Sequence, residues 1–274
     1  MGSVRIVGSS HAAARSGAIA LAFTACAFAV SGASGASQTG GEPRGTPTAH
    51  HFGGTRAVGA LFPPGGRVHT CTASVVHSHA RNLLITAAHC ITGTGDGYVF
   101  VPGYRNGIAP LGSWTVISAY ATPQWMTGHD EQADIAFLVV APQRIGGRLR
   151  QIEDITGAYT LAKAPVAGIR VTVPAYALGS DDQPVTCTAR VYYTDGFPAF
   201  NCNPYPSGTS GAPWLARQGH TWAVVGAIGG LHQGGCLSWT SYSAAFGAGT
   251  LRAAAAAEKG RHASPFPPIG SSGC

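Results

Sequence analysis

Short apolar runs separated by turn-forming residues limit most strongly what this chain of 274 residues can fold into. Runs such as CTASVV, YVFV and DIAFLVV are bounded by clusters of Gly, Pro, Asn and Asp. With 39 Gly, 18 Pro and only 10% charged residues, the chain is poorly suited to long solvated helices. Runs of this length at fairly even spacing are typical of β-sandwiches and β-barrels. We therefore predict an all-β fold.

Two sets of such runs divide the chain, one over about 55–142 and one over about 152–250, with a Gly- and Arg-rich linker between them. Within 251–274, the stretch LRAAAAAEK has a helical pattern and is followed by Gly260, which predicts a short C-terminal helix and a tail. Residues 37–54 contain few apolar side chains, and we expect a flexible N-terminus or a pro-segment there.

Residues 1–36 have the pattern of a secretory signal peptide. Arg5 and Arg15 lie before the apolar run 18–30 (AIALAFTACAFAV), which is short for a membrane span. Small residues then offer a cleavage site after Ala36. A retained membrane anchor is the alternative, but the pattern favours a secreted, extracellular protein without stable membrane association.

The net charge gives no indication of a nucleic-acid partner. Removing Arg5 and Arg15 with the signal peptide lowers the formal charge from +6 to +4, and no dense Lys/Arg stripe with interleaved aromatic residues remains. The nearest cluster consists of three arginines in the predicted linker, Arg144, Arg148 and Arg150. We expect a monomer that binds no nucleic acid.

The cysteine count indicates disulfide bonds. Of seven cysteines, Cys26 lies in the signal peptide, and an even number remains for an oxidising compartment. The six are Cys71, Cys90, Cys187, Cys202, Cys236 and Cys274. A zinc site is the competing hypothesis, with His69, Cys71, His77, His79, His89 and Cys90 as candidate ligands. Their spacing matches no common zinc pattern, so we expect neither a metal nor another cofactor.

Three motifs contain the residue types that nucleophilic catalysis by serine requires, namely a serine, a base and an orienting carboxylate. His89 follows a strand-like run in LLITAAHC, Asp134 precedes an apolar strand in ADIAF, and Ser210 lies between glycines in GTSGAP. Each alone is compatible with an ordinary turn or loop residue. All three in the order His, Asp, Ser are poorly explained by chance.

On these motifs the chain resembles the chymotrypsin-like serine peptidases, particularly the secreted bacterial members that share CTASVV, NLLITAAHC, ADIAF and G-x-SG-x-P. The resemblance covers about 58–246. It implies two packed six-stranded antiparallel β-barrels, over 55–142 and 152–250, with a cleft between them. An α/β-hydrolase is excluded, because its order is Ser, acid, His and its elbow has a glycine where this chain has Ala212.

The resemblance implies a serine endopeptidase that hydrolyses protein or peptide substrates through an acyl-enzyme. It implies that His89 is the general base and then acid, that Asp134 orients it, and that Ser210 is the nucleophile. The backbone amides of Gly208 and Ser210 would form the oxyanion hole. Asp130 is the alternative carboxylate, but it lacks the following apolar strand.

Thr209 departs from the family pattern. Many members have an aspartate there that pairs with the N-terminal amine released on activation, and the usual Ile-Val-Gly-Gly start is also missing here. Either other hydrogen bonds hold the oxyanion turn, or the protein is a non-catalytic secreted binding or adhesion protein on the same fold. The complete triad favours an enzyme that needs no freed amine.

The specificity pocket is expected to lack a negative charge. Trypsin-like members have an acid six residues before the nucleophile, where this chain has Pro204. No Asp or Glu occurs between Asp195 and Glu258. We therefore predict cleavage after small or medium apolar P1 residues.

The alternative specificity is for acidic P1 residues. Alignment of VVGAIGG with the substrate-binding strand of the family places Ile228 where glutamyl endopeptidases have histidine, followed by Gly229 and Gly230. His232 lies four residues beyond Ile228 and is within reach of the pocket. A glutamyl-specific endopeptidase therefore remains the second hypothesis.

The resemblance also bears on the disulfides. Cys71 and Cys90 match the family bridge that holds the histidine loop, worth about 3 kcal/mol for a loop of roughly 20 residues. We expect Cys187–Cys202 before the nucleophile and Cys236–Cys274 at the C-terminus. A Cys202–Cys236 bridge across the pocket is the alternative.

Overall fold

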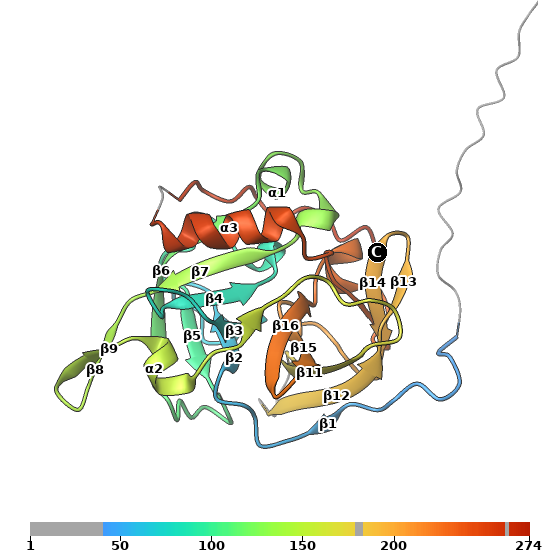
Figure 1. Ribbon diagram of the computed structural model, residues 1–274, viewed down its shortest axis with the longest axis horizontal. Coiled ribbons are helices and arrows are strands. Elements are labelled where there is room, and N and C mark those ends of the chain that lie inside the picture. Colours follow the sequence, from blue (N-terminus) through green and yellow to red (C-terminus); the bar gives the residue numbers. More distant parts are fainter. Residues whose placement is uncertain (1–40, 179–182, 261–262) are drawn as a thin grey trace, which may run out of the picture. The chain divides into compact units, whose positions relative to one another are not determined.

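Six antiparallel strands close into a barrel in the computed structural model, which describes residues 41–178, 183–260 and 263–274. In order around the barrel they are β2 (Val58–Phe62), β3 (Cys71–Val76), β4 (Leu83–Thr86), β7 (Ala136–Val140), β6 (Trp114–Ala121) and β5 (Val99–Pro102). Figure 1 shows them grouped on one side of the molecule. The predicted signal peptide lies outside the described residues.

Strand β6 shows how the side-chain pattern produces this barrel. Its first residues alternate, with Trp114 and Val116 fully buried while Thr115 and Ile117 face outward. This period of two places every second side chain on the inner face. The barrel core is therefore built from one face of each strand, as for Trp114, Phe100 and Leu138.

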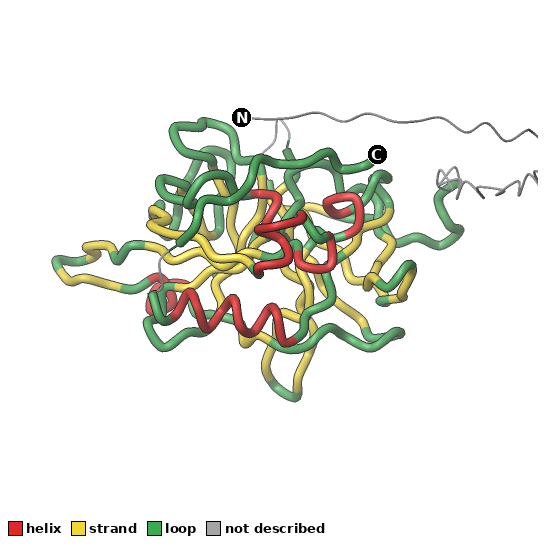
Figure 2. The backbone as a smooth tube through the Cα atoms, turned by 90° about the horizontal axis from the view of Figure 1, so that it is seen from above, coloured by secondary structure: helices red, strands yellow, loops and turns green. Residues whose placement is uncertain are grey.

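The second half of the chain forms two sheets. One has the order β1 (His50–His51), β12 (Pro184–Arg190), β11 (Arg170–Tyr176), β15 (Pro213–Gln218), β16 (Thr221–Ala227) and β10 (Thr160–Leu161). The other has the order β13 (Tyr192–Thr194), β14 (Phe197–Asn201) and β17 (Thr240–Tyr242). Neighbouring strands are antiparallel except β10 and β16. Figure 2 shows that strands and loops dominate the backbone, and the all-β prediction is confirmed.

These two sheets differ in detail from the single six-stranded barrel that we expected over 152–250. The break lies in the loop between β14 and β15, where Pro204 and Pro206 have no N–H to continue a ladder. The loop instead hydrogen-bonds to another loop, because the Cys202 N–H donates to the Trp239 carbonyl and the Tyr205 N–H to the Ser238 carbonyl.

The segment over 37–54 that we expected to be flexible is paired with the second half where the structure describes it. Strand β1 pairs with β12, and Thr48 bridges to Asn203. The Ala49 N–H donates to the Asn203 carbonyl at 2.8 Å, and the Asn203 N–H donates to the Pro47 carbonyl at 2.9 Å. The low apolar content did not prevent pairing, because these contacts use backbone groups.

Helix α3 (Ala248–Glu258) is the predicted C-terminal helix and packs on β6 and β7. Helices α1 (Pro123–Gly128) and α2 (Ile152–Thr156) were not predicted, because each is too short to show a periodic pattern. Local capping explains them: the Thr122 side chain accepts from Trp125 N in α1, and Gln151 with Asp154 forms a capping box in α2. The expected linker contains a hairpin of β8 (Gln143–Ile145) and β9 (Arg148–Arg150).

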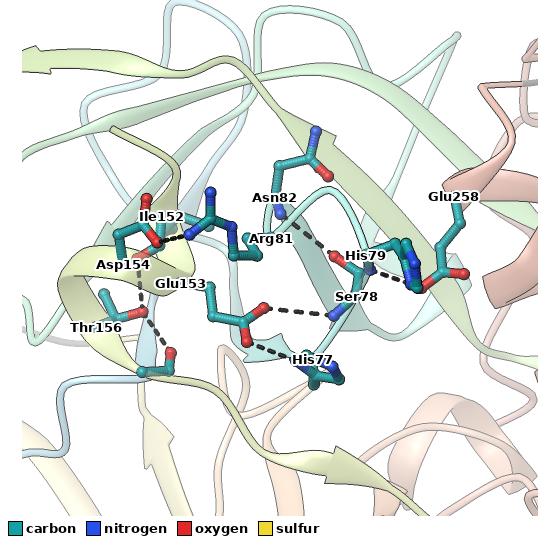
Figure 3. A network of polar contacts seen from close by, with 11 residues as sticks. His77, Ser78, His79, Arg81, Asn82, Ile152, Glu153, Asp154, Thr156 and Glu258 are labelled. Atoms are coloured by element: carbon teal, nitrogen blue, oxygen red, sulfur yellow. Dashed lines mark hydrogen bonds and ion pairs between the residues drawn. The ribbon is translucent and has the colours of Figure 1, made fainter. Parts of the chain in front are cut away.

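A polar network ties the connection between the two halves to the first barrel (Figure 3). In the turn between β3 and β4, Arg81 Nη1 donates to Asp154 Oδ1 at 2.5 Å, and His77 Nδ1 donates to Glu153 Oε1 at 2.6 Å. Both acids lie on α2. An apolar cluster joins the two halves, with Phe137 of the barrel and Val224 of the second half among its members.

Candidate active site

The turn that contains Ser210 depends on two glycines. Gly208 has φ +91, and a Cβ there would lie 2.3 Å from the Leu178 backbone nitrogen. Gly211 has φ +79, and a Cβ there would lie 2.1 Å from Thr86 Oγ1. Positive φ and close approach of other chain segments both favour glycine, so these residues allow the turn to pack against its neighbours.

Thr72 of β3 fastens this turn to the first barrel. Its N–H donates to the Ser210 carbonyl at 2.7 Å, and its hydroxyl donates to the Gly208 carbonyl at 3.2 Å. The Gly211 N–H donates to the Ile228 carbonyl at 2.7 Å on the other side of the turn. The turn is thus held by both halves. Thr72 was missed by the sequence reasoning, because CTASVV indicates only a buried strand.

Thr209 is buried inside the turn. Its hydroxyl donates to the Pro206 carbonyl at 2.7 Å, and its N–H points to the same oxygen at 3.3 Å. The Thr209 carbonyl accepts from the Ala212 N–H at 3.0 Å. Thr209 is therefore held within the turn by local hydrogen bonds.

His89 and Asp134 are hydrogen-bonded to each other. His89 lies in the short 3-10 helix after β4 (Ala88–Cys90), and Asp134 follows another such helix (Glu131–Ala133). His89 Nδ1 and Asp134 Oδ2 are 2.7 Å apart, and the His89 N–H donates to Oδ1 at 2.9 Å. Because the carboxylate accepts at Nδ1, the proton is fixed there and Nε2 is left with its lone pair.

Asp134 is completely buried and receives a third hydrogen bond. The Gly230 N–H donates to Oδ2 at 2.8 Å, and a Cβ at Gly229 would lie 2.9 Å from the same oxygen. Three donors compensate for the loss of water around this carboxylate. Asp130, the alternative, is exposed and caps a 3-10 helix through the Gln132 N–H.

His89 and Ser210 line the same cavity, which has a volume of about 610 Å³. Gly208 and Thr209 line it as well. Within the described residues, the N–H groups of Gly208 and Ser210 donate to no protein acceptor. The cavity therefore combines an oriented imidazole, a half-buried hydroxyl and two unengaged backbone donors.

The remaining predicted site residues fall in three places. Ile228 and His232 line the cavity. Gly229 and Gly230 lie behind Asp134 instead, as described above. Pro204 is exposed and does not line the cavity, whereas the next two residues, Tyr205 and Pro206, do. Counting back from the nucleophile misplaced this wall, because the loop is fixed by the hydrogen bond of Tyr205 to Ser238.

Tyr205, Thr240 and Ser241 give the pocket beside Ser210 part of its wall. The Tyr205 hydroxyl donates to the Val173 carbonyl, and burial raises the pKa of this phenol far above its ordinary value. The group therefore stays protonated and anchored. Among the described residues that line the cavity, none is an Asp or Glu. Asp195 is exposed in the turn between β13 and β14.

Three disulfides join Cys71 to Cys90, Cys187 to Cys202, and Cys236 to Cys274. The alternative bridge between Cys202 and Cys236 is therefore wrong for this structure. Ligand atoms of Cys71, His89 and Cys90 lie within 4.8 Å of one another. Because the two sulfurs are bonded to each other, they are not thiolates that could hold zinc.

Comparison with known proteins gives the same fold. A family model described as a trypsin-like peptidase domain matches residues 71–226. No curated protein sequence shows significant similarity to the chain.

Solved structures with this fold include a protease, Anisep, from Arthrobacter nicotinovorans, at 23% identity and TM-score 0.65, covering 77% of this chain and all of that one. A thermostable serine protease from an extremophilic microorganism has 21% identity and TM-score 0.63, covering 75% and 98%. A Glu endopeptidase in complex with MPD has 17% identity and TM-score 0.60, covering 78% and 98%.

Proposed function

This chain belongs to the family of trypsin-like peptidase domains and is a serine endopeptidase, and we propose that it cleaves peptide bonds through an acyl-enzyme on Ser210. One observation carries the proposal. A fully buried Asp134 holds His89 through two hydrogen bonds, and His89 lines the same cavity as Ser210. An imidazole oriented by a buried carboxylate, in one cavity with a serine hydroxyl, supports His89 as the general base that activates Ser210.

The proposed reaction begins when His89 Nε2 takes the proton of the Ser210 hydroxyl while Oγ attacks the substrate carbonyl carbon. The carbonyl oxygen becomes negative and accepts hydrogen bonds from the N–H groups of Gly208 and Ser210. His89 then gives its proton to the leaving amine as the peptide bond breaks. A water molecule hydrolyses the ester by the same route in reverse. Asp134 stays ionised and stabilises the imidazolium.

We propose small or medium apolar side chains at P1. Ile228 offers an apolar surface, and the absence of an Asp or Glu side chain from the described lining leaves a Lys or Arg substrate without a counter-charge. Burying an unpaired charge costs several kcal/mol, which would be lost from transition-state binding.

Specificity for acidic P1 residues is the alternative, and two observations favour it. His232 lines the cavity, and one structure of the same fold is a Glu endopeptidase. The contacts of His232 argue against it. Its Nδ1 donates to the Ser272 carbonyl at 3.0 Å, so a neutral ring has only an acceptor at Nε2. Only Nε2 is left to contact a substrate carboxylate, and it can donate to one only in a ring that carries both protons.

A peptide series tests both specificities. Substrates that differ only in Ala, Val, Leu, Lys, Arg or Glu at P1 are compared by kcat/KM. We expect the apolar residues to be preferred over Lys and Arg. A Glu preference that is lost in His232→Ala would establish the alternative. No turnover, combined with binding of an intact protein ligand, would establish the non-catalytic binding or adhesion function.

We also propose that the enzyme is secreted and acts as a monomer on extracellular proteins or peptides. The signal-peptide pattern over 1–36 and the three disulfides support export. Across the described ranges, the helices are all too short or too polar to cross a membrane. Detection of the processed chain in culture medium, with a new N-terminus after Ala36, tests this proposal.

A further inference from the structure

The C-terminal segment lies along the cavity that contains His89 and Ser210. Three of its residues, Ile269, Ser272 and Cys274, line that cavity. We call residues 266–274 the tail strap. This segment contacts the rest of the protein at several separate points. In Figure 1 the chain end lies by the second half of the molecule.

The first barrel holds one end of the tail strap. The Phe266 N–H donates to the Gly93 carbonyl at 2.6 Å, and the Phe266 side chain is buried with the barrel core. His129 Nε2 donates to the Pro268 carbonyl at 2.9 Å. Gly93 follows the helix of His89, and His129 precedes the one that leads to Asp134. The strap therefore begins beside the two loops that supply His89 and Asp134.

The second half of the chain holds the other end. Gln233 Nε2 donates to the Gly270 carbonyl at 2.8 Å, and His232 Nδ1 donates to the Ser272 carbonyl at 3.0 Å. The disulfide between Cys236 and Cys274 closes this end covalently. Carbonyls at every second residue, 268, 270 and 272, thus face the protein, as in an extended segment. The strap links both halves beside the cavity.

The position of these contacts fixes which part of a substrate the strap meets. His232 and Gln233 follow Gly229 and Gly230 in the chain and line the cavity together with Ile228 and Ser241. Under the proposed function Ile228 contacts the P1 side chain. The strap is bonded to His232 and Gln233, shortly after Ile228 in the chain, so we expect it to meet the residues before the scissile bond.

We propose that the tail strap is a wall of the substrate cleft that limits how many residues before the scissile bond are bound. Ile269 supplies its apolar contact. This side chain is 52% exposed although it is branched and apolar, and it lines the cavity. The proposal rests on the proposed endopeptidase function. It assigns a specificity role to a segment that the catalytic motifs do not include.

The first test compares peptide amides with the same P1 residue and leaving group and with one, two or four residues before the scissile bond. Rates are divided by the fraction of chains that react with a fluorophosphonate. For the unmodified protein, we expect kcat/KM to rise no further once the substrate has two residues before the scissile bond. For Cys274→Ser, we expect the four-residue substrate to gain about tenfold over the two-residue substrate.

Mild reduction by a thiol frees Cys274 from Cys236 without a substitution. Cys236 and Cys274 are both exposed, whereas the other four cysteines of the disulfides are buried. The outer bridge is therefore expected to be reduced first, as alkylation and mass spectrometry would show. The length dependence should then match that of Cys274→Ser.

The second test changes the wall itself. Ile269→Asp should lower kcat/KM about tenfold for substrates with an apolar residue at P2, because an apolar contact is replaced by a charge. Ile108→Asp is the matched control, since Ile108 is 63% exposed and does not line the cavity. It should leave the rates unchanged.

The outcomes separate this inference from the proposed function. If the length dependence is identical before and after release of Cys274, the strap is not a wall. If release abolishes fluorophosphonate labelling, the strap holds the active site together, and the inference is also overturned. If the unmodified protein is never labelled, the proposed function itself has failed.

Discussion

Gly208 is tightly constrained by its surroundings, because a Cβ there would lie 2.3 Å from the Leu178 backbone nitrogen. Gly208→Ala keeps the backbone N–H of this residue, but the added Cβ must displace it from the proposed oxyanion. We therefore expect kcat to fall by about 10²–10³, the usual effect when one oxyanion donor no longer acts. Gly107→Ala is the matched control. Gly107 also has positive φ, at +79, but a Cβ there meets nothing within 4 Å. Steady-state kinetics that show equal losses in both variants would contradict this role of Gly208.

Thr209 carries the second prediction at the residue scale. Thr209→Val removes the hydroxyl that donates to the Pro206 carbonyl but keeps the shape of the side chain. We expect a loss of about 1 kcal/mol in the free energy of unfolding. Activity should fall by about tenfold, since 1.4 kcal/mol in the barrier corresponds to that factor. Thr209→Ser keeps the hydroxyl and should remain close to the unmodified protein by denaturant titration and kinetics.

The sequence identifies the proposed catalytic residues more directly than the residues that surround them. His89, Asp134 and Ser210 each lie in a motif whose spacing is local, and the structure places them at one site. Tyr205 was missed by one position, because only a long-range hydrogen bond to Ser238 fixes its loop. Ile269 has no motif at all, and its place in the cavity depends on a chain segment far away in sequence.

At the scale of elements, β1 has an effect that its two residues do not suggest. The segment around it pairs with Asn203, in the loop that leads to Ser210. Strand patterns could not predict this pairing, because HH has no apolar alternation. Helix α3 was predicted because it has 11 residues and a run of alanines.

A chain that begins at Gly53 should therefore be less stable than one that begins at Ser37. It loses the backbone hydrogen bonds of Pro47, Ala49 and Phe52 to the second half. Each of these hydrogen bonds contributes roughly 1 kcal/mol, and hydrogen bonds to water partly replace them. We therefore expect Tm to fall by about 4–8 °C. Calorimetry measures Tm, and kcat should fall as the loop before Ser210 loosens. Identical Tm values for the two chains would show that β1 does not support the loop.

For the whole molecule, the patterns of short strands predicted an all-β protein of two halves, and the structure has this architecture. The division of the second half into two sheets was not predictable, because strand pairing depends on loop geometry. The connection between the halves is held by Arg81 and His77 on one side and by acids of α2 on the other. These contacts join residues more than 70 positions apart, beyond the range of local patterns.

The molecule as a whole is also expected to be active without proteolytic activation. Thr209 forms local hydrogen bonds in place of an ion pair, and β1 holds the preceding loop from outside. We infer that the oxyanion turn needs no freed N-terminal amine. The chain beginning at Ser37 is therefore expected to be active as it stands.

Active-serine labelling tests the central claim most directly. The chain beginning at Ser37 is treated with a fluorophosphonate, and the modified residue is identified by peptide mass spectrometry. We predict one label per chain, on Ser210, that is absent in Ser210→Ala and formed far more slowly in His89→Ala. Tm should be unchanged in Ser210→Ala, whereas His89→Ala should stay folded with a lower Tm, because the buried Asp134 loses the His89 Nδ1 donor. Peptide hydrolysis should fall on the order of 10⁶-fold in either variant, as for a cooperating unit. Labelling at another residue, or only after the N-terminal segment is trimmed, would contradict the account.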